Sequence, residues 1–254
     1  MIFRPPGEQG MLRNQSRVEA EIIEAVKRLE ERYYGVQSQL ALTGTNAAVD
    51  FYRSGVSSIQ GMAANVDEPR VMKYIRAVEG HVRKWRVFTP YLGGLRRAFE
   101  IGVGPGYLFR IMMDLYGTDM RGCDIDPTTN RVFRDLREEL GLSARVMTHR
   151  VVARQDIPIP DGSEAVIGFW TVFTETFSLK DHKRFVAQCR EKLVGPKKLV
   201  MLFNTRGYDE CPEIFKWYQT FAAFPLLAEE AGGGVGRHKD VNPRDKSAFC
   251  IAEL

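Results

Sequence analysis

Residues 99–108 read FEIGVGPGYL, a short apolar run with one acid, followed by three alternating glycines. Glycines let the backbone turn sharply and bring a ligand close to main-chain amides, where a side chain would collide with it. A dinucleotide-binding fingerprint, G-x-G-x-x-G, needs its third glycine at position 107, where Tyr107 stands. The stretch therefore does not fit a pyrophosphate loop, and its pattern is E-x-G-x-G-x-G from Glu100 to Gly106.

Around this stretch, short apolar runs alternate with longer amphipathic segments. The predicted strands cover residues 98–102, 120–124, 145–152, 165–169, 199–204 and 249–254, and the predicted helices cover 106–116, 127–140, 181–193 and 211–231. This alternation is typical of βαβ units, so we predict an α/β fold with a doubly wound, mostly parallel sheet. Ligands of such sheets bind at the carboxyl ends of the strands, so we expect the site in the turns after the first, second and fourth strands.

The N-terminal portion has a different, helical pattern. Apolar residues spaced three and four apart predict an amphipathic helix over 17–34, and a second long helix is expected from Asp67 to Pro90. We therefore divide the chain into a helical N-terminal cap or substrate lid, residues 1–95, and a cofactor-binding core, residues 96–254.

The pattern E-x-G-x-G-x-G resembles the first motif of the Rossmann-like (class I) S-adenosylmethionine-dependent methyltransferases. In that family the acid at the strand end precedes the loop, and a carboxylate suits a cofactor that carries an ammonium and a sulfonium. The resemblance implies S-adenosylmethionine as cofactor, and it implies that Glu100, Gly102, Gly104 and Gly106 contribute to its binding site.

A second acid supports the same resemblance. Asp124 closes the apolar run 120–124, 18 residues after Gly106, where one βα unit would bring it beside the glycine loop. A carboxylate there can accept hydrogen bonds from both ribose hydroxyls. By resemblance to the family, Asp124 is the ribose ligand and Ile125 packs on the adenine, with Asp126 as the competing ribose ligand.

A third segment, DIPIPDGSEAVI at 156–167, looks like the family's L-P-F-x-D-G-S-F-D segment that leads into the fourth strand. The acid that the family often places four residues before the Leu falls on Ala153 here. Adenine would then be held by the main chain around Ala153 and Arg154, or by Asp156 after a shift in register.

Candidates for chemistry follow the fourth predicted strand. Phe169 stands where the family flanks the methionine part of the cofactor, and Trp170 can stack on the substrate or pack in the core. Glu175 is a candidate base or a partner for a substrate ammonium, unless it is simply solvated. His182 lies near the position of a catalytic histidine in some O-methyltransferases, although it also fits the first turn of a helix.

Several absences narrow the substrate. The sequence has no Asn/Asp-Pro-Pro-aromatic segment after the fourth strand, no cysteine placed for cytosine methylation, and no carboxylate cluster with metal-ligand spacing. The leading hypothesis is therefore methyl transfer to an N or O atom of a small molecule held under the cap, without a metal. The candidates for the pocket wall are aromatic residues of the cap: Tyr33, Tyr34, Phe51 and Tyr52.

Two alternatives stay open. Residues 70–97 carry eight Lys and Arg against one acid in a chain of net charge +4, which could serve an RNA or protein substrate, or could simply be a solvated helix face. Aminopropyl and aminocarboxypropyl transferases share the family's nucleotide pocket. Nucleic acid is the less favoured partner, and the sequence does not indicate an oligomeric state.

The composition fits a globular protein of 254 residues with 44% hydrophobic and 27% charged residues. No apolar run has the length of a spanning helix, and the first residues lack the apolar segment of a secretory signal. The four cysteines form no C-x-x-C pair. We therefore expect reduced thiols, a cytoplasmic location and no membrane contact.

Overall fold

The computed structural model describes residues 16–29, 89–124, 131–169, 177–203, 212–223 and 248–254. The chain divides into two compact units. We call residues 83–103, 116–125 and 145–254 the sheet unit, and residues 1–82, 104–115 and 126–144 the helical unit.

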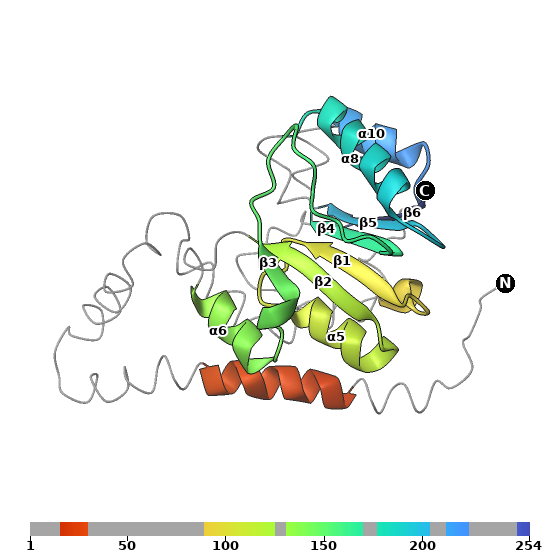
Figure 1. The fold of residues 1–254 in the computed structure, drawn as a ribbon. Coiled ribbons are helices and arrows are strands. Elements are labelled where there is room, and N and C mark those ends of the chain that lie inside the picture. Colours follow the sequence, from red (N-terminus) through yellow and green to blue (C-terminus); the bar gives the residue numbers. More distant parts are fainter. Residues whose placement is uncertain (1–15, 30–88, 125–130, 170–176, 204–211, 224–247) are drawn as a thin grey trace. The chain divides into compact units, whose positions relative to one another are not determined.

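The sheet unit is built on six strands, drawn as arrows in Figure 1. These are β1 (Arg97–Ile101), β2 (Asp119–Asp124), β3 (Val146–Thr148), β4 (Ala165–Phe169), β5 (Lys198–Phe203) and β6 (Ala248–Glu253). Their order in the sheet is β3-β2-β1-β4-β5-β6. The first five strands are parallel to one another, whereas β6 pairs antiparallel with β5. The predicted doubly wound, mostly parallel sheet is confirmed, and its order reverses between β1 and β4.

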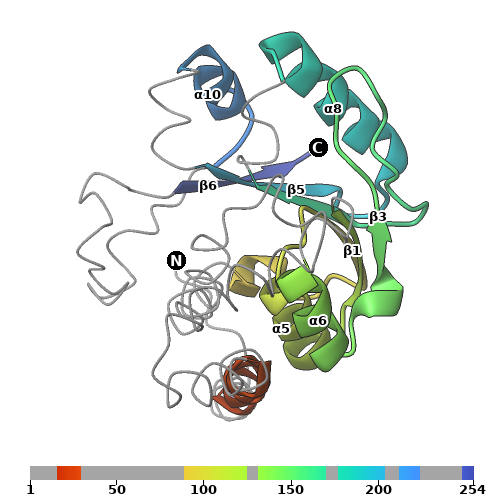
Figure 2. The same ribbon diagram turned by 90° about the vertical axis from the view of Figure 1, so that its left-hand side faces the viewer.

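Helices α8 (Leu179–Lys192) and α10 (Pro212–Gln219) lie on the same face of this sheet (Figure 2). Alternate strand residues face them and form one apolar core with Phe185, Cys189 and Tyr218 of the helices. The strand contribution comprises Phe99, Ile101, Cys123, Val166, Leu199, Met201, Cys250 and Ala252. Because side chains alternate along a strand, Glu100 must point to the opposite face of the sheet.

The strand starts are joined through Glu164, which precedes β4. Its carboxylate accepts hydrogen bonds from the backbone N–H of Arg96 at 2.6 Å and from the Nε of Arg96 at 2.9 Å. Its own backbone bonds Arg97 of β1 and Lys198 of β5. These bonds, chiefly the one from the Arg96 N–H, lower the pKa of the Glu164 carboxyl.

We expect Glu164→Gln to lower the free energy of unfolding by about 1–2 kcal/mol at pH 7, because it removes charge-assisted hydrogen bonds from a buried side chain. A carboxyl with a lowered folded pKa stabilises the protein above its unfolded pKa, and this contribution is lost as the pH falls through the folded value. In urea titrations, the difference between wild type and variant should therefore shrink below about pH 4. Asp161→Asn is the control, because the Asp161 side chain is 91% exposed; an equal loss in both variants would contradict the assignment.

The helical unit contains a helix at residues 16–29, α5 (Tyr107–Tyr116) and α6 (Arg131–Glu139). The helix 16–29 buries Val18, Ile22, Ala25, Val26 and Leu29. Its predicted amphipathic character is thus confirmed, and the remaining predicted turns, 30–34, lie outside the described residues.

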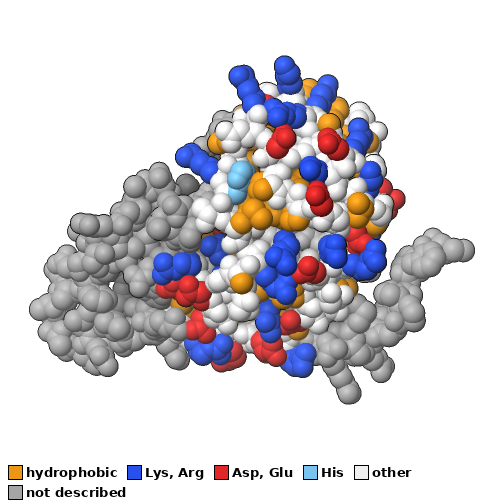
Figure 3. Space-filling view, viewed as in Figure 1, with side chains coloured by type: hydrophobic (Ala, Val, Ile, Leu, Met, Phe, Trp, Pro, Cys, Tyr) orange, Lys and Arg blue, Asp and Glu red, His pale blue; other side chains and the backbone are white. Residues whose placement is uncertain are grey.

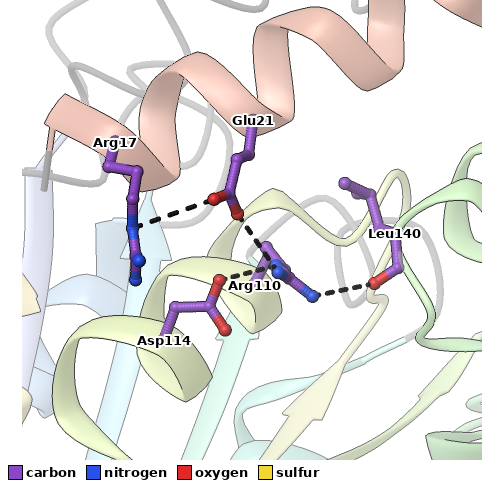
Figure 4. Close-up of polar contacts among 5 residues, drawn as sticks. All are labelled: Arg17, Glu21, Arg110, Asp114 and Leu140. Carbon is purple, nitrogen blue, oxygen red and sulfur yellow. Dashed lines mark hydrogen bonds and ion pairs between the residues drawn. The ribbon is translucent and has the colours of Figure 1, made fainter. Parts of the chain in front are cut away.

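Arg110 of α5 contacts both the helix 16–29 and the residue that follows α6 (Figure 4). Its guanidinium contacts Glu21 at 3.3 Å, Asp114 at 2.7 Å and the carbonyl of Leu140, just after α6, at 3.3 Å. A second ion pair joins Arg28 and Glu139 at 3.4 Å. The N-terminal helix is therefore fastened to α5 and to the end of α6.

The prediction differs most from the structure at the third strand. It was expected over 145–152, but β3 covers only Val146–Thr148, and Ser143–Arg145 form a 3-10 turn. Arg145 is held there because its guanidinium bonds the side chain of Asp119. β3 is an edge strand with Met147 and Thr148 exposed, so little apolar burial supports a longer strand.

The second predicted cap helix lies outside the described residues, apart from Thr89 and Pro90, which belong to a 3-10 turn, Thr89–Leu92. Within the described part of the chain, no helix has the length and apolar character needed to span a membrane.

Figure 3 shows Lys and Arg side chains over the region of α8. Among the basic residues of α8, Arg184 is paired with Asp156 and Lys192 with Asp161.

Candidate functional site

Glu100 is a buried acid near the carboxyl end of β1. It pairs with Gly122 of β2 on one side and Ile167 of β4 on the other, and its side chain is 1% exposed. Within the described residues, its Oε2 has no hydrogen-bond partner. Burial, and secondly the negative charge of Asp124, raise the pKa of Glu100 well above its usual value. A buried carboxylate in this state calls for a cationic or hydrogen-bond-donating ligand.

Asp124 ends β2 on the same face of the sheet as Glu100. Because Gly122 is the register partner of Glu100, Asp124 stands two residues further along, as a diagonal neighbour. Gly122 lacks a side chain, so none projects from β2 opposite Glu100. Asp124 is half-buried, and its carbonyl accepts the N–H of His149 at 2.7 Å. Two acids that repel each other are thus held at the carboxyl edge of adjacent strands.

The glycine loop leaves β1 directly after this pair. The N–H groups of Gly102 and Val103 both donate to the carbonyl of Cys123, at 2.8 and 3.3 Å, which ties the loop to the end of β2. Gly102, Gly104 and Gly106 have φ angles of 75°, 55° and 85°, a region that favours glycine.

Gly106 precedes α5, and its carbonyl accepts the N–H of Arg110 at 3.1 Å. The start of α5 therefore has no capping side chain, and a helix start of this kind can take an anionic ligand group. A Cβ added to Gly106 would lie 2.7 Å from Cδ1 of Leu142. A larger residue here would have a strained backbone and would require a neighbouring group to shift.

The turn after β3 contains Ala153 and Arg154, with Arg154 in a left-handed conformation at φ 67°. Arg184 of α8 donates to the Arg154 carbonyl at 2.6 Å and to the Asp156 carboxylate at 2.8 Å. Gln188 pairs with both backbone groups of Ile157, at 3.1 and 2.8 Å. Helix α8 thus fixes the turn, and Asp156 is already paired with a cation.

No family model matches the chain, and no curated protein matches its sequence. Solved structures do match it: the geranyl diphosphate C-methyltransferase from Streptomyces coelicolor A3(2) is 11% identical, with 76% of this chain and 86% of that chain covered and a TM-score of 0.48. The precorrin-6y C5,15-methyltransferase from Geobacter metallireducens GS-15 is also 11% identical, covering 68% and 88% with a TM-score of 0.46.

The CcbJ methyltransferase from Streptomyces caelestis is 17% identical, with 57% of this chain and 55% of that chain covered and a TM-score of 0.40; the chain spans about half the length of that protein. The strand order, the antiparallel β6, and the glycine loop between β1 and α5 define a Rossmann-like, doubly wound α/β fold.

His182 lies in the first turn of α8 and is fully buried. Its Nδ1 is 3.2 Å from the hydroxyl of Tyr218, and its ring packs edge-on against Phe177 and Tyr218. Burial lowers the pKa of His182 to about 4. This placement favours a core role over that of a general base, which stays a prediction.

We expect the burial of His182 to make the free energy of unfolding decrease as the pH is lowered. The folded pKa, about 4, lies below the ordinary value of 6.5, so the neutral ring stabilises the fold above pH 6.5 and this contribution is lost as the pH falls toward 4. The change is up to about 3 kcal/mol in the free energy of unfolding. Denaturant titrations across this range should show a steeper slope for wild type than for His182→Gln; equal slopes would contradict the burial.

Several predicted site residues lie outside the described residues: Tyr34, Ile125, Trp170 and Glu175. Phe169 is the last residue of β4, where only its backbone is described. Among the described residues, no group of three or more His, Cys, Asp and Glu could hold a metal ion.

Sequence reasoning missed Arg184 and Gln188, which hold the turn after β3. A signal for them existed, since two polar side chains four residues apart share one face of the predicted helix 181–193. Nothing in the local sequence, however, indicates which loop such a face contacts.

Proposed function

We propose that the chain is an enzyme that binds S-adenosylmethionine at the carboxyl edge of β1 and β2 and transfers its methyl group to a small molecule. The observation that carries this proposal is the buried Glu100, with an oxygen that lacks a hydrogen-bond partner among the described residues, at the start of the glycine loop. An ammonium group beside Glu100 would compensate its charge and offset the repulsion from Asp124.

We propose further contacts for the residues of the glycine loop and for those at the ends of β2 and β4. Asp124 would accept the ribose hydroxyls, and Ile125, the next residue, would pack on the adenine. The backbone of Gly102, Gly104 and Gly106 would adjoin the methionine part of the cofactor, with Phe169 beside it.

For the adenine amino group, we favour the main chain around Ala153 over Asp156. The Asp156 carboxylate is 70% exposed and paired with Arg184, and the Arg154 carbonyl also accepts from Arg184. Ala153 is half-buried at the start of this fixed turn.

The bound cofactor supplies an activated methyl group on a sulfonium, so the protein's main task is to orient an acceptor nitrogen or oxygen and exclude water. We propose that Trp170, Tyr34 and the cap, residues 1–95, form the acceptor site, with Glu175 or His182 as candidate bases. One matched methyltransferase was crystallised with geranyl diphosphate, a small molecule.

A cytoplasmic location agrees with the free, buried thiols of Cys123, Cys189 and Cys250.

The test is product analysis after incubation of the full chain with S-adenosylmethionine and pools of small-molecule acceptors. Methyl transfer leaves S-adenosylhomocysteine, which we expect to accumulate only when an acceptor is present. Methylthioadenosine would instead indicate an aminopropyl or aminocarboxypropyl transferase. Turnover with RNA or protein alone, falling steeply with added salt, would overturn the small-molecule assignment.

A further inference from the structure

Arg137 of α6 is a buried arginine that contacts the glycine loop. The residue is 4% exposed, although arginines are almost never fully buried unless their polar groups are paired. Its Nη1 donates a hydrogen bond to the carbonyl of Gly104 at 3.0 Å, across 33 residues of sequence. One function of this buried cation is therefore to hold the loop's main chain.

The contact is made to a peptide group that has a carbonyl oxygen but no N–H. Pro105 follows Gly104 and has no N–H, so the Gly104 carbonyl is the hydrogen-bonding group of that peptide. Arg137 satisfies it while Gly104 stays in its left-handed conformation at φ 55°. Another rotation of this peptide would break the hydrogen bond and turn the loop carbonyl elsewhere.

The aliphatic part of the same side chain supports the next turn of the loop. The Cγ of Arg137 lies 3.5 Å from the position that a Cβ of Gly106 would take, and Leu142 Cδ1 lies 2.7 Å from it. Leu142 is fixed in turn, because its N–H donates to the Arg137 carbonyl at 2.7 Å. Arg137 and Leu142 together form a seat for Gly104 and Gly106.

We propose that Arg137 is a positioning residue that holds the glycine loop in the conformation that receives the cofactor. It acts through the Gly104 carbonyl and need not touch the cofactor. The inference rests on the proposed S-adenosylmethionine site, but the effect of Arg137 on the order of the loop can be measured separately in the cofactor-free protein.

The experiment compares Arg137→Met with Arg134→Met in the full chain. Arg134 is the matched control, since it lies on the same helix and pairs with Asp135 and Glu138. In Arg137→Met, we expect amide hydrogen exchange in a peptide covering 102–109 to accelerate roughly tenfold without cofactor, as expected for losing a hydrogen bond from a charged group. S-adenosylhomocysteine should bind roughly tenfold more weakly, and Arg137→Lys, which keeps a cationic donor, should recover part of both effects.

The measurements on Arg137→Met can overturn the proposal in two ways. Unchanged exchange and affinity in Arg137→Met would overturn the proposal, as would exchange that accelerates equally in peptides of β4 and β5, which would indicate general destabilisation. No binding of S-adenosylhomocysteine by wild type would contradict the proposed function, while the exchange measurement would still decide the role of Arg137.

Discussion

Gly106→Val should weaken the binding of S-adenosylhomocysteine by roughly a hundredfold or more while the sheet stays folded. Valine is strained at φ 85°, and its Cβ would meet Leu142 Cδ1 at 2.7 Å in a site where Leu142 is fully buried. Either Leu142 or the loop must therefore shift, and we expect the loop to leave the conformation that would contact the cofactor, because valine is strained at this φ. Calorimetric titration measures the affinity, and circular dichroism reports the fold.

The matched control is Gly117→Val, since Gly117 also has a left-handed φ, 63°, but open space around its Cβ position. It should lose a similar amount of stability to backbone strain and keep its affinity. Adding Leu142→Ala to Gly106→Val should recover part of the binding if the collision matters. Full affinity in Gly106→Val would show that the glycine loop does not bind the cofactor.

Asp124→Ala should weaken cofactor binding by about 1.5–3 kcal/mol, the range for losing a charge-assisted hydrogen bond to a ligand hydroxyl. The structure places Asp124 at the last position of β2, next to Glu100, whose pKa it raises. Asp126→Ala should weaken cofactor binding clearly less than Asp124→Ala does. A larger effect of Asp126 in calorimetry would make Asp126 the ribose ligand instead.

Much of the fold could be predicted because buried parallel strands are nearly continuous apolar runs. The predicted run 165–169 coincides with β4, and 98–102 is one residue later than β1 at each end. The predicted length of the edge strand β3 is too great, because an exposed strand is not marked by a continuous apolar run. Residues 30–88, with the second cap helix and the aromatic wall candidates Tyr33, Tyr34, Phe51 and Tyr52, lie outside the described residues.

The candidate site was predicted less completely, for a physical reason. Glu100 and Asp124 follow from local motifs, because a strand end and a glycine loop are contiguous in sequence. The residues that hold the loops act across long separations, as in the contact between Arg137 and Gly104 or between Arg184 and Arg154. Such pairs depend on how helices pack, which local periodicity does not contain.

The most direct test of the cofactor assignment is a calorimetric titration of the full chain with S-adenosylhomocysteine and, separately, with NAD. Tyr107 occupies the place of the third glycine of a dinucleotide loop, and the buried carboxyl group of Glu100 offers a pyrophosphate no positive charge. We predict saturable binding of S-adenosylhomocysteine and no measurable binding of NAD. Tighter binding of NAD, or no binding of S-adenosylhomocysteine, would contradict the account.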